Sequence, residues 1–165
     1  MIAELISVGT ELLLGDIVDT NAVYIAQTLS RVGIGCYYRT TVGDNRERLA
    51  GALKTALGRS DIVITIGGLG PTMDDITKQG VADALASALV PDDDHANWLR
   101  ERYYHRGITE PPESVLAQSL VPEQGRGVPN PNGTALGAIF ETRGKVALCL
   151  PGPPNELIPM VDQTI

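Results

Sequence analysis

The feature that most constrains this chain is the segment 67–77, which reads GGLGPTMDDIT. It follows a run of five apolar residues, 62–66, and precedes apolar residues at helical spacing. A strand, a glycine-rich turn and a helix in this order build anion sites, because glycines let backbone N–H groups approach a ligand and the helix N-terminus adds partial positive charge. Asp74 and Asp75 in the same turn would repel a phosphate. We therefore expect a phosphorylated ligand handled with a metal ion, and Lys78 to neutralise phosphate charge.

A simpler interpretation of this segment needs no ligand. Thr72 and Asp75 lie three residues apart, which is close to a capping box, and Asp74 alone would serve as an N-cap. Three glycines, a proline and two acids in one turn exceed what a cap requires, so we favour a site.

The first 90 residues alternate between apolar runs typical of strands and segments with helical spacing. Asp19 or Thr20, and then Asn45, have side chains that cap helix N-termini, and Gly33 and Gly58 are expected to end those two helices. Such alternation implies a parallel sheet with ligand sites at the C-terminal ends of its strands. We predict strands over 2–8, 34–42 and 61–66, a loop or short turn over 10–15, and helices over 20–32, 46–57 and 76–89.

The second half is less regular. A hairpin signal near the C-terminus joins two short strand-like runs through residues 142–144, and residues 121–131 are too rich in Pro and Gly for regular structure. We thus predict an α/β protein with a three-layer α/β/α architecture, a mostly parallel sheet and an antiparallel hairpin near the C-terminus, in one domain over 1–165. The further elements expected are helices over 95–106 and from 111–113, strands over 137–141 and 145–150, and a last helix from Asn155 or Glu156.

Acidic residues follow three of the predicted strands. Glu11, Asp44 and Asp75 come after the first, second and third strand, so the topology brings them to one edge of the sheet. Any one of them alone is ordinarily a solvated surface acid. Together they form a plausible set of oxygen ligands for Mg²⁺ or a similar hard cation, or a general base.

Two further loops carry possible binding groups. Residues 130–135, NPNGTA, are either an ordinary Asn-Gly turn or a loop that offers amide N–H groups and the Thr134 hydroxyl to a phosphate or ribose. Residues 150–154, LPGPP, are either a rigid connector or a wall of the pocket.

The composition excludes several functions. The formal charge is −7 with a pI of about 4.7 and no basic stripe, so we expect no binding to nucleic acid. No apolar run approaches the length of a membrane span and no signal peptide is visible, so we expect no membrane contact and a cytoplasmic location. Cys36 and Cys149 are expected to be buried free thiols. His95 and His105 are expected to be exposed or to pack, away from the site.

Several motifs together resemble one family, the CinA (competence/damage-inducible) proteins. Residues 67–77 resemble the signature GGLGPTxDDxT, and residues 8–15, VGTELLLG, resemble the opening of these proteins. Asp19-Thr20-Asn21, VGDN at 42–45, PNPNGTA at 129–135 and LPGPPNE at 150–156 also fit, in order and over essentially the whole chain.

This sequence departs from the pattern in two places. Leu136 stands where the family usually has proline, and Ser114-Val115-Leu116 stands in place of an Asn-rich turn. These departures predict weaker contacts to the ligand.

The resemblance implies a molybdopterin-binding-protein-like (MogA/MoaB-type) fold, in the N-terminal part of a longer CinA-type protein. In that superfamily the acids matching Asp44 and Asp75 sit in the pterin site, and Glu11 matches an acid of related domains. The resemblance also implies ADP-ribose pyrophosphatase activity in pyridine-nucleotide recycling, dependent on a divalent metal and stimulated by K⁺. The deamidase activity of the family belongs to a separate domain that these motifs do not include.

Two functions therefore stay open. One is metal-dependent hydrolysis of ADP-ribose to AMP and ribose 5-phosphate, with Mg²⁺ or Co²⁺ and possibly K⁺; Asp44 and Asp75 would be catalytic and hold the metal. The other is a non-catalytic module that binds molybdopterin or a nucleotide. In either case we expect a small phosphorylated ligand and a homo-oligomer. The expected ligand contacts are Thr10, Glu11, Gly67, Gly68, Gly70, Pro71, Thr72, Asp74, Thr77, Lys78, Asn130, Gly133, Thr134, Gly152 and Pro153.

Overall fold

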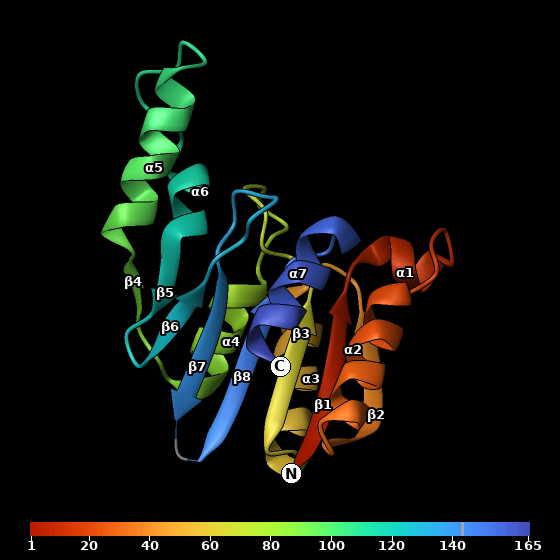
Figure 1. Cartoon of the computed structure of the whole chain (residues 1–165). Helices are drawn as coiled ribbons and strands as arrows, with labels where there is room; N and C mark the ends of the chain where they lie inside the picture. The colour runs from red at the N-terminus through yellow and green to blue at the C-terminus, as the bar shows by residue number, and fades with distance from the viewer. Residues whose placement is uncertain (143) are drawn as a thin grey trace.

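The apolar runs of the sequence form a six-stranded sheet through the middle of the molecule (Figure 1). This computed structural model describes residues 1–142 and 144–165. The strand order is β2-β1-β3-β8-β7-β6; β2, β1, β3 and β8 run parallel, whereas β7 is antiparallel to both of its neighbours. The strands are β1 (Ile2–Val8), β2 (Gly35–Val42), β3 (Ile62–Ile66), β6 (Gly125–Val128), β7 (Gly137–Thr142) and β8 (Lys145–Leu150).

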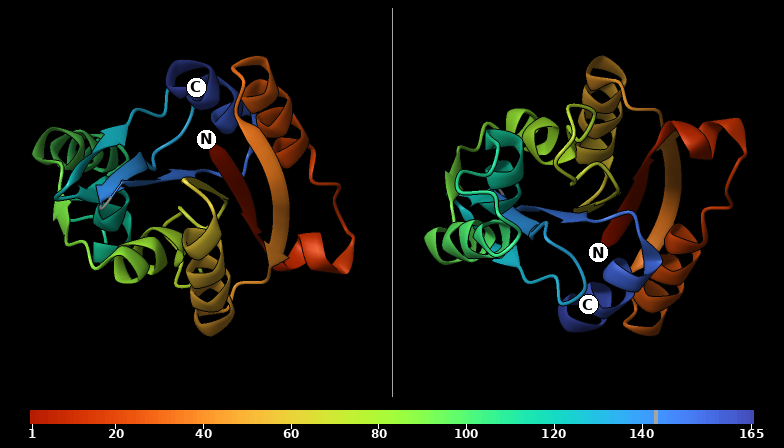
Figure 2. Two further views of the ribbon diagram at one scale, coloured as in Figure 1. Left: turned by 90° about the horizontal axis from the view of Figure 1, so that it is seen from below. Right: turned by 90° about the horizontal axis from the view of Figure 1, so that it is seen from above.

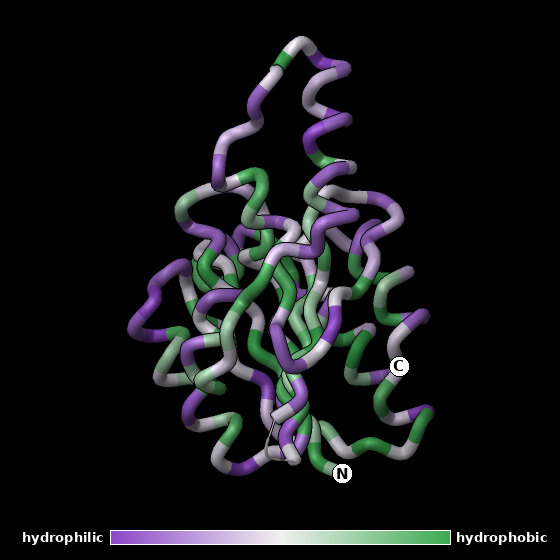
Figure 3. Tube along the Cα trace, turned by 90° about the vertical axis from the view of Figure 1, so that its left-hand side faces the viewer, coloured by the Kyte–Doolittle hydropathy of each residue, from purple (hydrophilic) through white to green (hydrophobic). Residues whose placement is uncertain are grey.

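Helices cover both faces of this sheet. α2 (Thr20–Arg31) and α7 (Pro154–Thr164) lie on one face, and α3 (Arg46–Arg59) and α4 (Thr77–Leu85) lie on the other (Figure 2). The predicted three-layer α/β/α architecture with a mostly parallel sheet is therefore confirmed. The hydropathy trace shows the same layering, with hydrophobic segments concentrated in the central strands (Figure 3).

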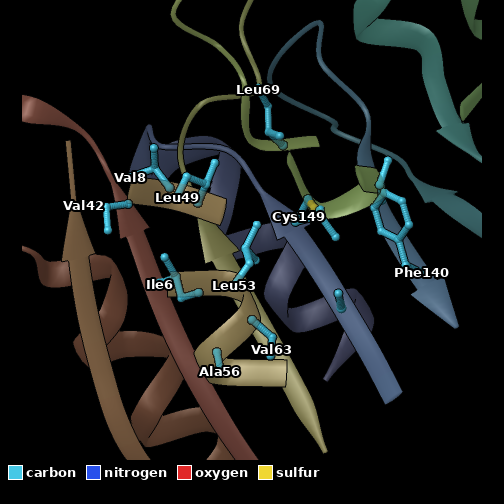
Figure 4. Packing of buried hydrophobic residues seen from close by; sticks show 14 of the residues in the cluster. Ile6, Val8, Val42, Leu49, Leu53, Ala56, Val63, Leu69, Phe140 and Cys149 are labelled. Carbon is cyan, nitrogen blue, oxygen red and sulfur yellow. The ribbon is translucent and has the colours of Figure 1, made fainter. Parts of the chain in front are cut away.

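The central strands are mostly apolar because both of their faces are buried. In β1, Ala3 and Leu5 pack under α2 and α7, while Ile6 and Val8 pack against the core under α3 and α4 (Figure 4). A strand buried on both faces gives a continuous apolar run rather than an alternating one. This explains why the first strand is so clear in the sequence.

A small projection interrupts this pattern between α4 and β6. Here β4 (Leu89–Pro91) and β5 (Leu120–Pro122) pair antiparallel, and α5 (Asp93–Tyr104) extends away from the body of the molecule (Figure 1). α6 (Glu113–Leu116) and a 3-10 turn, Ala117–Ser119, complete the projection.

The sequence prediction was wrong in two places here. The helix predicted over 76–89 ends at Leu85, where Ala86 adopts a left-handed conformation with φ of 51°, and the following residues form β4. Residues 121–131 are not devoid of regular structure, because they contribute to β5 and β6. Pro91 and Pro122 each end their strand, so neither interrupts the short ladder.

Other boundaries differ by less. Residues 10–15 form a short helix, α1 (Thr10–Leu14), where a loop or short turn was expected, and α3 continues through Gly58 to Arg59. Asp19 and Asn45 cap α2 and α3 as predicted, accepting hydrogen bonds from the backbone N–H groups of residues 22 and 48. The antiparallel hairpin of β7 and β8 is confirmed; Arg143 in its predicted turn lies outside the described residues.

The C-terminal ends of the parallel strands are tied together. Gly9, directly after β1, donates its N–H to the Val42 carbonyl at the end of β2, at 2.9 Å. Gly67, directly after β3, donates to the Leu150 carbonyl at the end of β8, also at 2.9 Å. These bonds bring the loops of four strands to one edge. None of the described helices is long and apolar enough to cross a membrane.

Candidate functional site

The loops at this edge enclose a cavity of about 510 Å³. That volume is within the range of small-molecule sites, and the location is where a parallel α/β sheet binds its ligands. Most of the predicted site residues line it. The lining residues are Val8, Gly9, Glu11, Asp44, Gly67, Gly68, Leu69, Gly70, Pro71, Thr72, Asp74, Asp75, Gln118, Gly133, Thr134, Ala135, Pro151, Gly152, Pro153 and Glu156.

The glycine turn after β3 requires glycine at its first two positions. Gly67 and Gly68 have φ of 96° and 68°, which side chains rarely adopt. A Cβ on Gly67 would also collide with the Val8 carbonyl oxygen, and one on Gly68 with the Thr77 hydroxyl. Leu69 packs into the core and anchors the turn (Figure 4). The backbone of the turn thus lines the cavity, while Leu69 holds the turn against the core.

Asp75 is fixed by its own turn. Its Oδ2 atom accepts hydrogen bonds from the Thr72 backbone N–H at 2.9 Å and from the Thr72 hydroxyl at 2.6 Å. A Cβ on Gly70 would lie 2.6 Å from the same oxygen, so the glycine makes room for the carboxylate. The Thr72–Asp75 pair predicted as a capping box exists, but it closes the turn ahead of α4. The N-cap of α4 is Ile76, without a side-chain bond, so the capping role considered for Asp74 is wrong.

Asp44, after β2, is held in the same way. Its Oδ2 atom accepts from the Thr10 N–H at 3.0 Å and from the Thr10 hydroxyl at 2.8 Å. Thr10 itself is not among the residues that line the cavity, so it positions Asp44. The Oδ1 atoms of Asp44 and Asp75 make no hydrogen bond within the described residues. Both carboxylates are therefore oriented through one oxygen and free at the other.

The donor set fits a metal that arrives with its ligand better than a permanent protein cage. Glu11, Asp44 and Asp75 all line the cavity, but the described residues contain no cluster of three or more His, Cys, Asp or Glu side chains that would hold an ion. Mg²⁺ is commonly held by one or two carboxylates together with substrate phosphates. Asp44 and Asp75, each with a free oxygen, match that mode.

Lys78 was predicted to face the ligand cavity, but its side chain lies elsewhere. Its ammonium group is buried and donates to the carbonyl oxygens of Gln118, at 3.2 Å, and Leu120, at 2.7 Å. Burial lowers the pKa of this amine from 10.5 to about 8. Lys78 thus links α4 to the segment that carries Gln118, and Gln118 lines the cavity.

The lowered pKa of Lys78 predicts a pH-dependent stability. Below pH 8 the amine is protonated in both the folded and the unfolded state, and burial of the charged amine destabilises the folded state. From pH 8 to about 10.5 the folded amine is neutral while the unfolded amine still binds a proton, so stability rises with pH. Relative to Lys78→Met, the free energy of unfolding should rise by up to about 3 kcal/mol between pH 7 and pH 10.

Denaturant titrations of both proteins at the two pH values measure this difference. The methionine variant keeps the Cys149 thiol, whose pKa is raised to about 11 by burial. Because the Lys78 charge lowers the pKa of that thiol, its contribution cancels only in part, and Lys78→Met combined with Cys149→Ala against Cys149→Ala alone removes the remainder. A difference between the two proteins that stays constant with pH would contradict the assignment.

The second loop contributes Gly133 and Thr134 to the cavity, but not Asn130. The Asn130 amide donates to the Ala135 carbonyl at 3.1 Å and to the Glu156 carboxylate at 2.7 Å. It is therefore a positioning residue within the loop, and the predicted ligand contact at Asn130 is not supported.

His95 was expected to lie away from the site, and this prediction was wrong. Its Nε2 atom lies 2.8 Å from the Thr134 carbonyl oxygen, which can only accept, so that nitrogen carries the proton. The ring stacks on Trp98, with ring centroids 5.0 Å apart. The projecting helix α5 therefore supports the second loop of the cavity. No signal in the sequence links His95 to Thr134, because the two are distant along the chain.

The third loop forms a wall of the cavity through Gly152 and Pro153, as one of the two sequence interpretations held. The Gly152 carbonyl accepts a hydrogen bond from the Asn21 side chain at 2.6 Å, which fixes the loop against the start of α2. Thr77 is fully buried, and its hydroxyl has no partner among the described residues. It packs against Gly68 rather than facing the ligand.

Three polar or conformationally important lining residues were not predicted as ligand contacts. They are Gly9, Gln118 and Glu156. Glu156 lies in the motif LPGPPNE, so its place there was the available signal. Gln118 also had one, because with Pro112 and Glu113 it matches the family pattern in the segment that otherwise departs from it.

The two departures from the family pattern lie outside the cavity lining. Leu136 and Val115 are both buried, with 6% and 5% of their surface exposed. Neither is among the residues that line the cavity, so the expected loss of ligand contacts at these positions is not supported. The cysteines are free thiols as predicted, although only Cys149 is fully buried.

Comparisons with known proteins agree with this fold. A family model described as a probable molybdopterin binding domain matches residues 4–165. The CinA-like protein of Dictyoglomus turgidum is 48% identical over 162 residues, which are 98% of this chain and 39% of that protein. The chain thus spans about two fifths of the length of such curated relatives.

Solved structures lead to the same group. A CinA protein of unknown function from Thermoplasma acidophilum superimposes with a TM-score of 0.89 and 34% identity, over 98% of this chain and 94% of that one. The tungsten cofactor synthesizing protein MoaB of Pyrococcus furiosus gives a TM-score of 0.62 at 21% identity, over 98% and 88% of the two chains, which shows the shared fold alone. The chain belongs to the CinA family, through a domain of the probable molybdopterin-binding type.

Proposed function

We propose that this domain hydrolyses the diphosphate of a nucleoside diphosphate sugar, with ADP-ribose as the substrate. Water adds across the P–O–P bridge, and the products are AMP and ribose 5-phosphate. Such a reaction would serve pyridine-nucleotide recycling. The observation that carries the proposal is the pairing of a glycine turn that lines the cavity with two oriented aspartates in the same cavity.

The charge of the cavity defines how a diphosphate is held. Five carboxylates line it, and among the described residues no Lys, Arg or His side chain does. A diphosphate would therefore be bound by backbone N–H groups together with a cation, because the side chains alone repel it.

The residues divide these roles. The N–H groups of Gly68 and Gly70 bind phosphoryl oxygens, since that of Gly67 is donated to Leu150. Thr10 and Thr72 orient Asp44 and Asp75. A divalent metal, when bound by these aspartates, supplies charge neutralisation and activation of water. Glu11, whose carboxylate also lines the cavity, would accept the proton of the attacking water. Gly133 and Thr134 close the opposite side of the cavity.

A binding module is the second candidate. The family description names molybdopterin, and the cavity has the size for a pterin as well as for a nucleotide. Oriented carboxylates do not separate the two functions, because they also suit the N–H donors of a pterin ring.

Turnover distinguishes the two. The purified domain is incubated with ADP-ribose, K⁺ and either Mg²⁺ or Co²⁺, and AMP is followed by chromatography. We expect AMP to form with metal and to stop after chelation. Folded protein that binds ADP-ribose but releases no AMP would support the binding module instead.

A further inference from the structure

Glu156 is an acid of the cavity to which the proposed reaction gives no part. It lies in the first turn of α7 and lines the cavity beside the second loop. Its Oε2 atom accepts the hydrogen bond from Asn130 at 2.7 Å. Gly133 packs directly against this carboxylate, and a Cβ there would collide with it. The carboxylate is therefore held in one position by Asn130 and Gly133.

Asn130 fixes the position of the Glu156 side chain. An Asn side chain has two N–H donors, and here one goes to the Ala135 carbonyl and the other to Glu156. Its oxygen accepts from the Asn132 N–H at 3.2 Å. With these groups committed, Asn130 has no donor left for a ligand, and Glu156 is the group that faces the cavity.

The other oxygen of Glu156, Oε1, makes no hydrogen bond within residues 1–142 and 144–165. An ionised carboxylate only accepts hydrogen bonds, and it repels phosphate. Unless a cation lies between them, a part of the ligand that carries donors and no negative charge therefore suits this carboxylate best. In a nucleoside diphosphate sugar, the hydroxyl groups of a ribose meet both conditions.

We propose that Glu156 is a specificity residue that accepts a hydrogen bond from a ribose hydroxyl of the ligand. It thereby directs the sugar toward α7 and the diphosphate toward the glycine turn. This assignment rests on the proposed ligand class but not on turnover. It gives the cavity two ends with different chemistry.

Binding measurements with two non-cleavable ligands test it. Methylenediphosphonate carries the diphosphate unit alone, and its ribose 5-ester adds one sugar without a base. Their dissociation constants are measured by calorimetry with Mg²⁺ for the unaltered chain and for Glu156→Ala. We expect the variant to bind the ester about tenfold more weakly or worse, and methylenediphosphonate as well as before or more tightly.

Two further variants complete the design. Asn130→Ala removes the hydrogen bond that positions the Glu156 carboxylate. It should show the same selective loss of affinity for the ester. Asp162→Asn changes an acid of the same helix that bonds to Tyr24 away from the cavity, and should leave both affinities unchanged.

The outcomes separate this assignment from the proposed function. Equal weakening of both ligands by Glu156→Ala, or no weakening of either, overturns the role of Glu156. If the unaltered chain binds the ester no more tightly than methylenediphosphonate, the role of Glu156 is overturned, whereas the proposed function is decided by release of AMP from ADP-ribose. Selective loss of the ester in a chain that releases no AMP supports the role of Glu156 while rejecting hydrolysis.

Discussion

Replacing Asp75 by asparagine is expected to lower the rate of ADP-ribose hydrolysis by about 100-fold or more while the domain stays folded. The amide oxygen can still accept both hydrogen bonds from Thr72, so the turn keeps its shape. What is lost is the negative charge on the oxygen that faces the cavity, and with it a ligand for the metal. Rates of AMP release and thermal melting of the purified variant measure the two effects.

A matched control separates the position of the acid from loss of charge in general. Asp83→Asn removes an acid from α4 that pairs with Arg46 on the exposed surface at 2.7 Å. Such an exposed pair contributes at most about 1 kcal/mol, and its loss should leave turnover unchanged. If Asp75→Asn hydrolysed ADP-ribose within twofold of the unaltered rate, Asp75 would have no part in the chemistry.

Gly67→Ala should have the largest effect on the fold. Its φ of 96° is unfavourable for any side chain, and the new methyl group would collide with the Val8 carbonyl oxygen, which belongs to the backbone of β1. We expect a loss of about 3 kcal/mol in the free energy of unfolding, which lowers the melting temperature by about 6–12 °C. Ligand binding should fall with it, because the glycine turn must move.

Gly33→Ala is the corresponding control. Gly33 also has a positive φ, of 78°, but a Cβ there would meet no atom within 4 Å. It therefore reports the conformational strain alone, of about 1–2 kcal/mol, at a place remote from the cavity. Calorimetric melting of both variants gives the comparison. Equal destabilisation would mean that the contact between Gly67 and β1 adds nothing.

The layered fold was predictable because its central strands are buried on both faces. The runs that became β1 and β3 are almost wholly apolar, and the helices between them have a single apolar stripe. Parallel connection then places every strand end on one edge. That is why Asp44 and Asp75 could be assigned to one cavity before their contacts were known.

The small second sheet was not predictable from local pattern. β4 and β5 have three residues each and are stabilised by pairing with each other across about 30 residues of chain. Neither has a strand signal of its own, and prolines at their ends point to turns. These two strands are stabilised by hydrogen bonds between distant segments, which no local sequence pattern reveals.

The direction of individual side chains was also beyond the sequence. Lys78 was expected one helical turn beyond Asp74 and Asp75, but α4 begins only at Thr77, so no helical turn lies between them. Its side chain instead reaches the carbonyls beside Gln118. Glu156 faces the cavity because Asn130 and Gly133 receive it, and this depends on loops that meet only in the folded chain.

The most direct test of the central claim is hydrolysis of ADP-ribose in ¹⁸O-labelled water, followed by mass spectrometry of both products. We expect AMP and ribose 5-phosphate in equal amounts, with one labelled oxygen on one of the two phosphates, and no product after chelation of the metal. Folded protein that binds ADP-ribose with metal and K⁺ but releases neither product would contradict it. The cavity would then hold its ligand without cleaving it.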